Sequence, residues 1–173
     1  MQFDLRDLIR DIPDFPKQGI LFRDVTTLLK DKHGFKHAIQ GLAARFRDTD
    51  VDKIVCIEAR GFILGGALAY ELGCGVVVIR KPGKLPSETV SQTYELEYGT
   101  DKIEIHKDAL EKGDRVLLVD DLLATGGTAK AAVDLVERLG GTIVGCAFLI
   151  ELGDLNGRRL LDKYDVFSLI RYD

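Results

Sequence analysis

The chain has 173 residues, of which 46% are hydrophobic, 30% are charged and four are proline. This composition excludes a disordered or fibrous protein, and the length suits a single domain with a substantial core. A formal net charge of −4 argues against a general nucleic-acid-binding surface, and the longest apolar runs reach about half of the ~20 residues that a membrane span needs.

The N-terminal part predicts two helices before any strand. A short helix is expected from Gln2 to Arg10, ahead of Pro13 and Pro16, which cannot continue it. An amphipathic helix is expected from Phe35 to Arg47. Acidic residues from Asp4 onward do not suit a secretory signal.

Strands and helices then alternate along the chain. The expected strands are Lys53–Ile57, Val76–Arg80, Val116–Val119 and Ile143–Ile150, with helices at Phe62–Leu72 and Ala129–Leu139 and an edge strand at Tyr164–Ile170. Alternation of this kind implies an α/β fold with a mostly parallel sheet and right-handed crossovers.

One long segment, Lys81 to Lys112, interrupts this alternation. Its first part is rich in Pro, Gly, Ser and Thr, and the alternating run Lys102–His106 predicts that the chain leaves the sheet and returns as a hairpin. Segments this long inside a compact domain are usually functional or disordered. We therefore expect part of a functional site here.

The most informative stretch is VLLVDDLLATGGT, from Val116 to Thr128. Its apolar residues suit a strand buried on both faces, and Asp120 and Asp121 mark its carboxyl end, where ligands bind in open α/β sheets. The small residues from Thr125 to Thr128 leave backbone N–H groups and a helix N-terminus open to a phosphate. A buried strand followed by an ordinary helix cap is the simpler alternative.

The carboxylates indicate which kind of phosphate ligand this turn binds. The turn lacks the lysine of an ATP-binding P-loop. Two acids beside an anion site would repel a phosphate, so they more plausibly accept hydrogen bonds from neighbouring hydroxyls. A ribose 5-phosphate supplies both groups.

Two basic segments complete the candidate site. Arg60 lies in EARG, at the turn after the first core strand, and its forked guanidinium suits a pyrophosphate. Arg80, Lys81 and Lys84 form a second cluster within RKPGKLP. A surface salt bridge and a solvated charge run are the alternatives.

Together these segments resemble the type I phosphoribosyltransferase family. DDLLATGGT is similar to the family's motif for 5-phosphoribosyl pyrophosphate (PRPP), in the form found in its adenine-specific members. The resemblance runs from about Phe15 to Leu152. It implies a type I phosphoribosyltransferase fold in one domain, 1–173, with a small N-terminal hood contributed mainly by 1–34 and a flexible catalytic loop at about 81–101.

The resemblance also implies a reaction and its partners. The enzyme would act in purine salvage, transferring the 5-phosphoribosyl group from PRPP to adenine and giving AMP and pyrophosphate. Mg²⁺ would arrive bound to PRPP, because the chain shows no cluster that would hold a hard cation alone. A cytoplasmic homodimer without nucleic-acid or membrane partners is expected, and three widely spaced cysteines favour a reducing compartment.

The roles of the substrate-binding residues follow from the same resemblance. Asp120 and Asp121 would hold ribose hydroxyls, and Arg60, Lys84 and the adjoining Arg80 and Lys81 would hold pyrophosphate. The 5-phosphate would be bound by Ala124, Thr125, Gly126, Gly127 and Thr128. A cis peptide is predicted at the Ala59–Arg60 bond, while Glu58 could either orient Arg60 or weaken anion binding.

The loop and the hood would supply the remaining residues. Glu97 and Tyr98 are expected to move over the site, excluding water, with Glu97 as general acid or base for the purine. Outward alternation of glutamates on a strand is the alternative. Adenine would lie against Leu21, Phe22 and Arg23, with Leu152 on the far side, although core packing and a salt bridge would also explain these residue types.

Two rival functions remain open from the sequence. One is a phosphoribosyltransferase for a 6-oxopurine such as hypoxanthine, guanine or xanthine, because the preference for adenine rests on family likeness. The other is a regulator that binds PRPP without turning it over. Such regulators typically add a DNA-binding helical module, and no spare basic segment fits in a chain of 173 residues with a net charge of −4.

Overall fold

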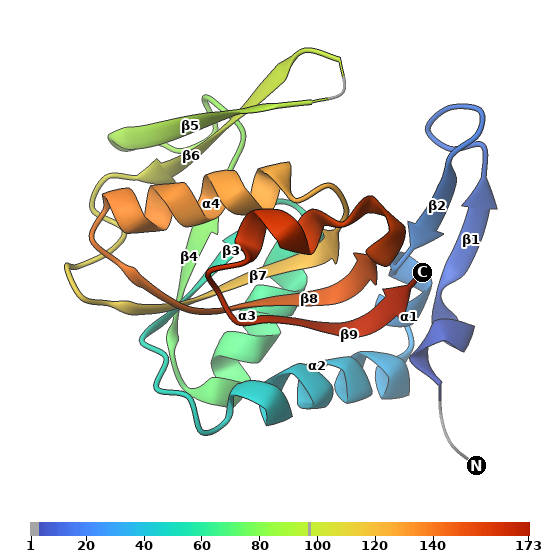
Figure 1. Cartoon of the computed structure of the whole chain (residues 1–173). Coiled ribbons are helices and arrows are strands. Elements are labelled where there is room, and N and C mark those ends of the chain that lie inside the picture. The colour runs from blue at the N-terminus through green and yellow to red at the C-terminus, as the bar shows by residue number, and fades with distance from the viewer. Residues whose placement is uncertain (1–3, 97) are drawn as a thin grey trace.

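The computed structural model describes residues 4–96 and 98–173 (Figure 1). Its centre is a five-stranded parallel sheet in the order β4-β3-β7-β8-β9. The strands are β3 (Lys53–Ile57), β4 (Gly75–Ile79), β7 (Arg115–Leu123), β8 (Thr142–Leu152) and β9 (Val166–Tyr172). The predicted α/β fold, including the edge strand near the C-terminus, is confirmed.

Helices cover both faces of this sheet (Figure 1). One face carries α2 (Lys32–Phe46) and α3 (Arg60–Leu72), and the other carries α4 (Gly127–Arg138) and the 3-10 helix η3 (Gly157–Leu161). Two short helices, α1 (Thr26–Leu29) and η2 (Gly153–Leu155), link these elements. No helix within the described residues is long and apolar enough to cross a membrane.

Strand alternation divides the apolar core into two parts. On β3, Ile54 and Cys56 face α2 and α3, while Val55 and Ile57 face α4. The same alternation on β7 continues both clusters, so the apolar residues of 54–57 and 116–119 are all buried on one face or the other. The continuous apolar runs in the sequence reflect this burial on both sides.

The N-terminal prediction is wrong beyond a single turn. Within the described residues the expected helix is only the 3-10 turn η1 (Leu5–Leu8), because Asp4 caps one turn and Ile9 is already extended. The chain then forms β1 (Arg10–Pro13) and β2 (Leu21–Asp24), an antiparallel pair that the sequence did not predict. We call residues 10–24 the N-terminal hairpin.

The predicted excursion between Lys81 and Lys112 is confirmed as a hairpin of β5 (Thr89–Glu95) and β6 (Thr100–His106). This β5–β6 hairpin lies over α4 in Figure 1, and the Arg138 guanidinium donates to the Ser91 carbonyl oxygen at 2.7 Å. A bridge between Arg80 and Glu104 ties it to the end of β4. Its tip therefore reaches toward the same end of the sheet as the carboxyl ends of the strands.

Asp24 fastens the N-terminal hairpin to α1. It is 7% exposed and accepts hydrogen bonds from Arg10 Nη2 at 2.5 Å, Thr26 N at 2.9 Å and Thr26 Oγ1 at 2.6 Å. The hydrogen bonds from Thr26 and Arg10 lower the pKa of Asp24 from 3.8 to about 2. The ionised carboxylate thus holds the first strand of the hairpin against the start of the helix.

We expect Asp24→Asn to lower the free energy of unfolding at pH 7 by about 1–3 kcal/mol, because two donors lose a charged acceptor. The folded-state pKa lies below the ordinary value, so this stabilisation is complete above pH 3.8 and is lost as the pH falls toward 2. Urea unfolding across this range should show the difference between the two proteins closing at low pH.

Asp11→Asn is the matched control, because Asp11 pairs with Arg23 at 2.6 Å but its side chain is 49% exposed. Its cost should stay below about 1 kcal/mol. An Asp24→Asn protein as stable as the wild type at pH 7 would contradict the anchoring role.

Candidate active site

The candidate site lies at the carboxyl ends of β3 and β7. In the strand order, β3 is followed by β4 on one side and β7 is followed by β8 on the other. The chain therefore leaves these two neighbouring strands in opposite directions, and a crevice lies between the loops that follow them. A cleft of about 370 Å³ opens there, within the range typical of small-molecule sites. Its lining comes from the sheet, the N-terminal hairpin and the β5–β6 hairpin.

Most of the predicted site residues line this one cleft. They are Leu21, Phe22, Arg23, Arg60, Lys81, Asp120, Asp121, Ala124, Thr125, Gly126, Gly127, Thr128 and Leu152. Arg80, Lys84 and Tyr98 lie outside the lining, and Glu97 lies outside the described residues. Glu58, whose role the sequence left open, also lines the cleft, and the sequence missed several other lining residues: Ile20, Ile57, Tyr94, Ile103, Leu122, Leu123 and Ala129.

The aspartate pair lies within β7 rather than after it. The prediction that the strand ends at Val119 is wrong, because the eleven-residue strand β8 pairs with β7 as far as Leu123. Asp121 is only 7% exposed. Two adjacent carboxylates are therefore held by a rigid backbone at the wall of the cleft.

Arg60 and burial set the charge state of this pair. Arg60 Nε lies 2.5 Å from Asp121 Oδ2, while Asp120 Oδ1 accepts the Asp121 N–H at 2.8 Å. Desolvation and the neighbouring Asp121 carboxylate raise the pKa of Asp120 well above its ordinary value. The charge of Arg60 thus balances that of Asp121. Among the described residues, Asp120 has no such cation, so a bound cation or a hydroxyl donor beside it would be favourable.

The turn from Ala124 to Thr128, predicted to bind a phosphate and here called the phosphate turn, depends on a glycine contact that its sequence alone does not show. Gly126 precedes α4 with φ of 89°, and a Cβ there would lie 2.5 Å from the Gly157 carbonyl oxygen. The helix begins at Gly127, two residues earlier than predicted, so its first N–H groups lie in the turn itself. This arrangement suits an anion at the helix N-terminus.

The turn after β3 places Arg60 at the start of α3. Only Glu58 and Ala59 separate the strand from the helix. The predicted cis peptide at Ala59–Arg60 is wrong by one residue: the cis bond joins Glu58 and Ala59, inside the turn, whereas Arg60 is already helical. A Cβ on Gly61 would lie 2.8 Å from Asp120 Oδ1, so α3 packs directly against the aspartate pair.

Glu58 makes its contacts with the second basic cluster rather than with Arg60. Its carboxylate lies 2.7 Å from Lys84 Nζ and 3.5 Å from Arg80 Nη2, and it accepts the Lys81 N–H. Burial opposes ionisation, yet these donors lower the pKa of Glu58. Glu58 therefore organises the second basic cluster instead of orienting Arg60.

The β5–β6 hairpin brings a different tyrosine to the cleft from the one predicted. Tyr94 lines it, with its hydroxyl 3.1 Å from Lys81 Nζ and 3.1 Å from Asp101 Oδ2, and Lys81 also pairs with Asp101. Tyr98 is 79% exposed, and Lys17 Nζ lies 5.3 Å from its ring centroid. Tyr98 thus contacts the N-terminal hairpin at the rim.

Opposite the phosphate turn, the N-terminal hairpin forms an apolar wall. Leu21 and Phe22 come from β2, and Leu152 comes from the end of β8. The Arg23 guanidinium lies 4.0 Å from the Tyr172 ring centroid and pairs with Asp11 at 2.6 Å. The salt bridge considered from the sequence is present, and the Arg23 side chain fastens this wall to β9.

Comparison with known proteins agrees with this geometry. The family model for the phosphoribosyl transferase domain matches residues 25–172. An adenine phosphoribosyltransferase from Geobacter metallireducens is 59% identical over 169 residues, covering 98% of this chain and 99% of that protein. The chain belongs to the adenine phosphoribosyltransferase family. The family and enzyme class predicted from the sequence are thereby confirmed.

Solved structures of family members share the whole fold. The adenine phosphoribosyltransferase from Thermoanaerobacter pseudethanolicus is 55% identical, with a TM-score of 0.95 over 97% of this chain and 98% of that chain. The enzyme from Saccharomyces cerevisiae is 42% identical, with a TM-score of 0.90 over 95% and 96% of the two chains. That structure is a complex with adenine and an imino-altritol bisphosphate.

We expect Gly126→Ala to raise the KM for PRPP at least about tenfold, because the added methyl group would displace the turn from Gly157. Gly73→Ala is the matched control: Gly73 also has a positive φ, 72°, but nothing lies within 4 Å of its added Cβ. This control should lose about 1–2 kcal/mol of stability without a change in KM. Steady-state kinetics and urea unfolding of both variants check the expectation, and an unchanged KM in Gly126→Ala would contradict it.

Proposed function

We propose that this protein transfers the 5-phosphoribosyl group of PRPP to adenine, giving AMP and pyrophosphate. The observation that carries the proposal is the aspartate pair beside a phosphate turn without bulky side chains, at one wall of a single cleft. Family membership supports the same reaction, because the relatives carry the name adenine phosphoribosyltransferase.

The proposed roles follow the chemistry of each wall. The turn from Ala124 to Thr128 would bind the 5-phosphate through backbone N–H groups. Asp120 and Asp121 would accept hydrogen bonds from the ribose hydroxyls, and their negative charge would stabilise the positive charge that develops at the anomeric carbon. A purine ring nitrogen forms a bond to the anomeric carbon as the bond between that carbon and the pyrophosphate oxygen breaks. The purine proton would pass to a base, for which Glu97 is proposed, and pyrophosphate would leave with the bonding electron pair.

Pyrophosphate would be held on the opposite side of the ribose. Arg60 and Lys81 both line the cleft, and their charges suit the oxygens of a diphosphate. Glu58 holds Arg80 and Lys84 next to Lys81, so the second basic cluster lies within one network. We propose that this cluster supplies further positive charge to the leaving group.

Mg²⁺ would fit this site when it binds together with the diphosphate of the substrate. Residues 4–96 and 98–173 contain no group of three or more His, Cys, Asp or Glu side chains that could hold a metal ion. Asp120 and Asp121 supply carboxylate oxygens, and Mg²⁺ commonly binds one or two carboxylates together with substrate phosphates. When bound, the ion would neutralise part of the diphosphate charge. The raised pKa of Asp120, caused by burial and the neighbouring Asp121, supports a site that favours added positive charge.

We propose that the protein is a cytoplasmic homodimer in which the N-terminal region, about 1–34, acts as a hood and residues 81–101 act as a flexible loop. Large apolar side chains at Ile63, Tyr70 and Val76 are 49%, 89% and 47% exposed, on α3 and the edge strand β4, and a second copy would cover them. Burial raises the pKa of Cys56 and Cys146 to about 12, which suits reduced core thiols. Sedimentation equilibrium at twice the chain mass would support the dimer.

A panel of bases tests the reaction itself. With PRPP and Mg²⁺, we expect pyrophosphate release and AMP formation with adenine and far less turnover with hypoxanthine, guanine or xanthine. Preferred turnover of a 6-oxopurine would replace the substrate assignment. Binding of PRPP without turnover of any base would support a regulator instead.

Glu97→Gln tests the proposed acid–base residue on the loop. We expect kcat to fall by about 10²–10⁴, with little change in the KM for adenine or PRPP, because the amide cannot exchange a proton with the purine. Glu95→Gln is the matched control, since Glu95 is an exposed glutamate at the end of β5. Equal kcat values for the two variants would reject the role of Glu97.

A further inference from the structure

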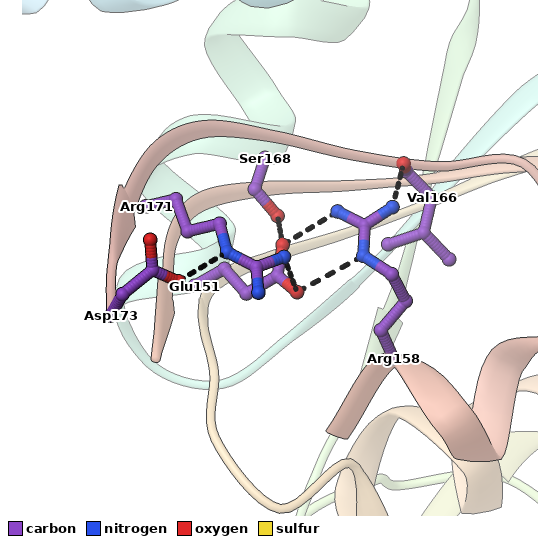
Figure 2. Close-up of polar contacts among 6 residues, drawn as sticks. All are labelled: Glu151, Arg158, Val166, Ser168, Arg171 and Asp173. Atoms are coloured by element: carbon purple, nitrogen blue, oxygen red, sulfur yellow. Dashed lines mark hydrogen bonds and ion pairs between the residues drawn. The ribbon is translucent and has the colours of Figure 1, made fainter. Parts of the chain in front are cut away.

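A buried carboxylate lies beneath the cleft, at the end of β8. Glu151 is 2% exposed and directly precedes Leu152. Arg158, from η3, binds it with both arms: Nε lies 3.0 Å from Oε1 and Nη2 lies 2.6 Å from Oε2 (Figure 2). The third nitrogen of Arg158 donates to the Val166 carbonyl oxygen at 2.7 Å. Arg158 therefore joins η3 to the carboxyl half of β8 and to the start of β9.

Other donors complete the coordination of this carboxylate. Ser168 Oγ donates to Oε2 at 2.7 Å, and Arg171 Nη1 lies 3.4 Å from Oε1 (Figure 2). The hydrogen bond from Arg158 is the main reason that the pKa of Glu151 is lowered. Glu151 is thus ionised and has a fixed geometry, which a buried charge requires.

The residue before Arg158 touches the phosphate turn directly. A Cβ on Gly157 would collide with the carbonyl oxygen of Ala124 and would lie 2.9 Å from Gly126 N. In the opposite direction, a Cβ on Gly126 would lie 2.5 Å from the Gly157 carbonyl oxygen. Two backbones are therefore in contact with no side chain between them, and a shift of Gly157 must move the turn.

We propose that the Glu151–Arg158 ion pair is a positioning element for the 5-phosphate turn, acting through the backbone contact of Gly157 with Ala124 and Gly126. This inference rests on the proposed function of the turn. Neither side chain is among the residues that line the cleft. The pair fixes η3, and η3 fixes the direction of the backbone N–H groups that receive the phosphate.

A positioning role for the ion pair can be distinguished from a purely stabilising one, because phosphate binding depends on the geometry of the turn. Backbone N–H groups bind an anion well only within narrow limits of distance and angle, so a small displacement weakens binding of the phosphate more than folding. Arg171 binds the same carboxylate but lies over Gly153, where an added Cβ would lie 2.7 Å from its Nε. Loss of Arg171 would therefore weaken the cluster without releasing Gly157.

We expect Arg158→Ala to raise the KM for PRPP about tenfold or more and to weaken binding of ribose 5-phosphate by a similar factor, while the KM for adenine changes less than about twofold. Arg158→Lys keeps the charge but not the two-armed contact, so it should recover part of the affinity. Glu151→Gln should resemble Arg158→Lys. Initial-rate kinetics and isothermal titration with ribose 5-phosphate measure these effects.

Arg159→Ala is the matched control, because Arg159 has an exposed side chain on the same 3-10 helix. It should leave both KM values unchanged, and Arg171→Ala should affect the KM for PRPP less than Arg158→Ala does. Thermal unfolding of each variant separates folded from unfolded protein. If Arg158→Ala does not fold, Arg158→Lys and Glu151→Gln carry the test.

Two outcomes would overturn the inference. Folded Arg158 and Glu151 variants that bind ribose 5-phosphate as tightly as the wild type would show that the pair only stabilises the fold. Equal increases in the KM for adenine and for PRPP would show a general loosening of the cleft. Failure of the wild type to convert adenine to AMP would reject the proposed function instead, and the titration would still decide the role of the ion pair.

Discussion

Two adjacent carboxylates inside a buried parallel strand impose the main physical constraint on this molecule. Asp120 and Asp121 repel each other, and burial removes the water that would screen them. The fold meets this cost with Arg60 at the start of α3, in contact with Asp121, and with Gly61, which lets the helix approach Asp120. The turn after β3 and the end of β7 therefore depend on each other, although Arg60 and Asp121 are 61 positions apart in the sequence.

The same principle of close approach extends to the other side of the site. Gly126 and Gly157 bring the phosphate turn and η3 into backbone contact, and Arg158 connects η3 to the buried Glu151. The site is thus built on close contacts at glycines, and one ion pair in the cleft, Arg60–Asp121, and one outside it, Glu151–Arg158, fix the segments that carry these glycines. Such an arrangement keeps bulky side chains away from the phosphate turn while leaving little freedom in its position.

The parts that could be predicted from sequence are those with a local signal. Continuous apolar runs identify β3, β7 and β8, and the aspartates with the small-residue turn mark the functional edge of the sheet. The N-terminal hairpin had no such signal, because its strands have four residues each and are paired through charges, Arg10 with Asp24 and Asp11 with Arg23. The pairing register of these two strands can be assigned only from the folded structure.

Several site residues were missed or misplaced for a related reason. Tyr94 and Tyr98 have similar sequence surroundings, and only the docking of the β5–β6 hairpin on α4 places Tyr94 rather than Tyr98 at the cleft. The partners of Glu58 come from the segment after β4, 22 to 26 positions away, so its role could not be inferred from its neighbour Arg60. Contacts between distant segments decide these assignments, and a single sequence does not contain them.

Three cations in or beside the cleft already have acidic partners, which affects how a diphosphate would bind. Arg60 is paired with Asp121, Lys81 with Asp101, and Lys84 with Glu58. A diphosphate bound as proposed would therefore exchange one set of ion pairs for another, so the net gain in binding free energy would be smaller than the number of cations suggests. Release of Asp121 from Arg60 would at the same time free a carboxylate for the ribose hydroxyls and for the cation that accompanies the substrate. In the proposed reaction, binding of the leaving group and release of the Asp121 carboxylate would thus be linked through Arg60.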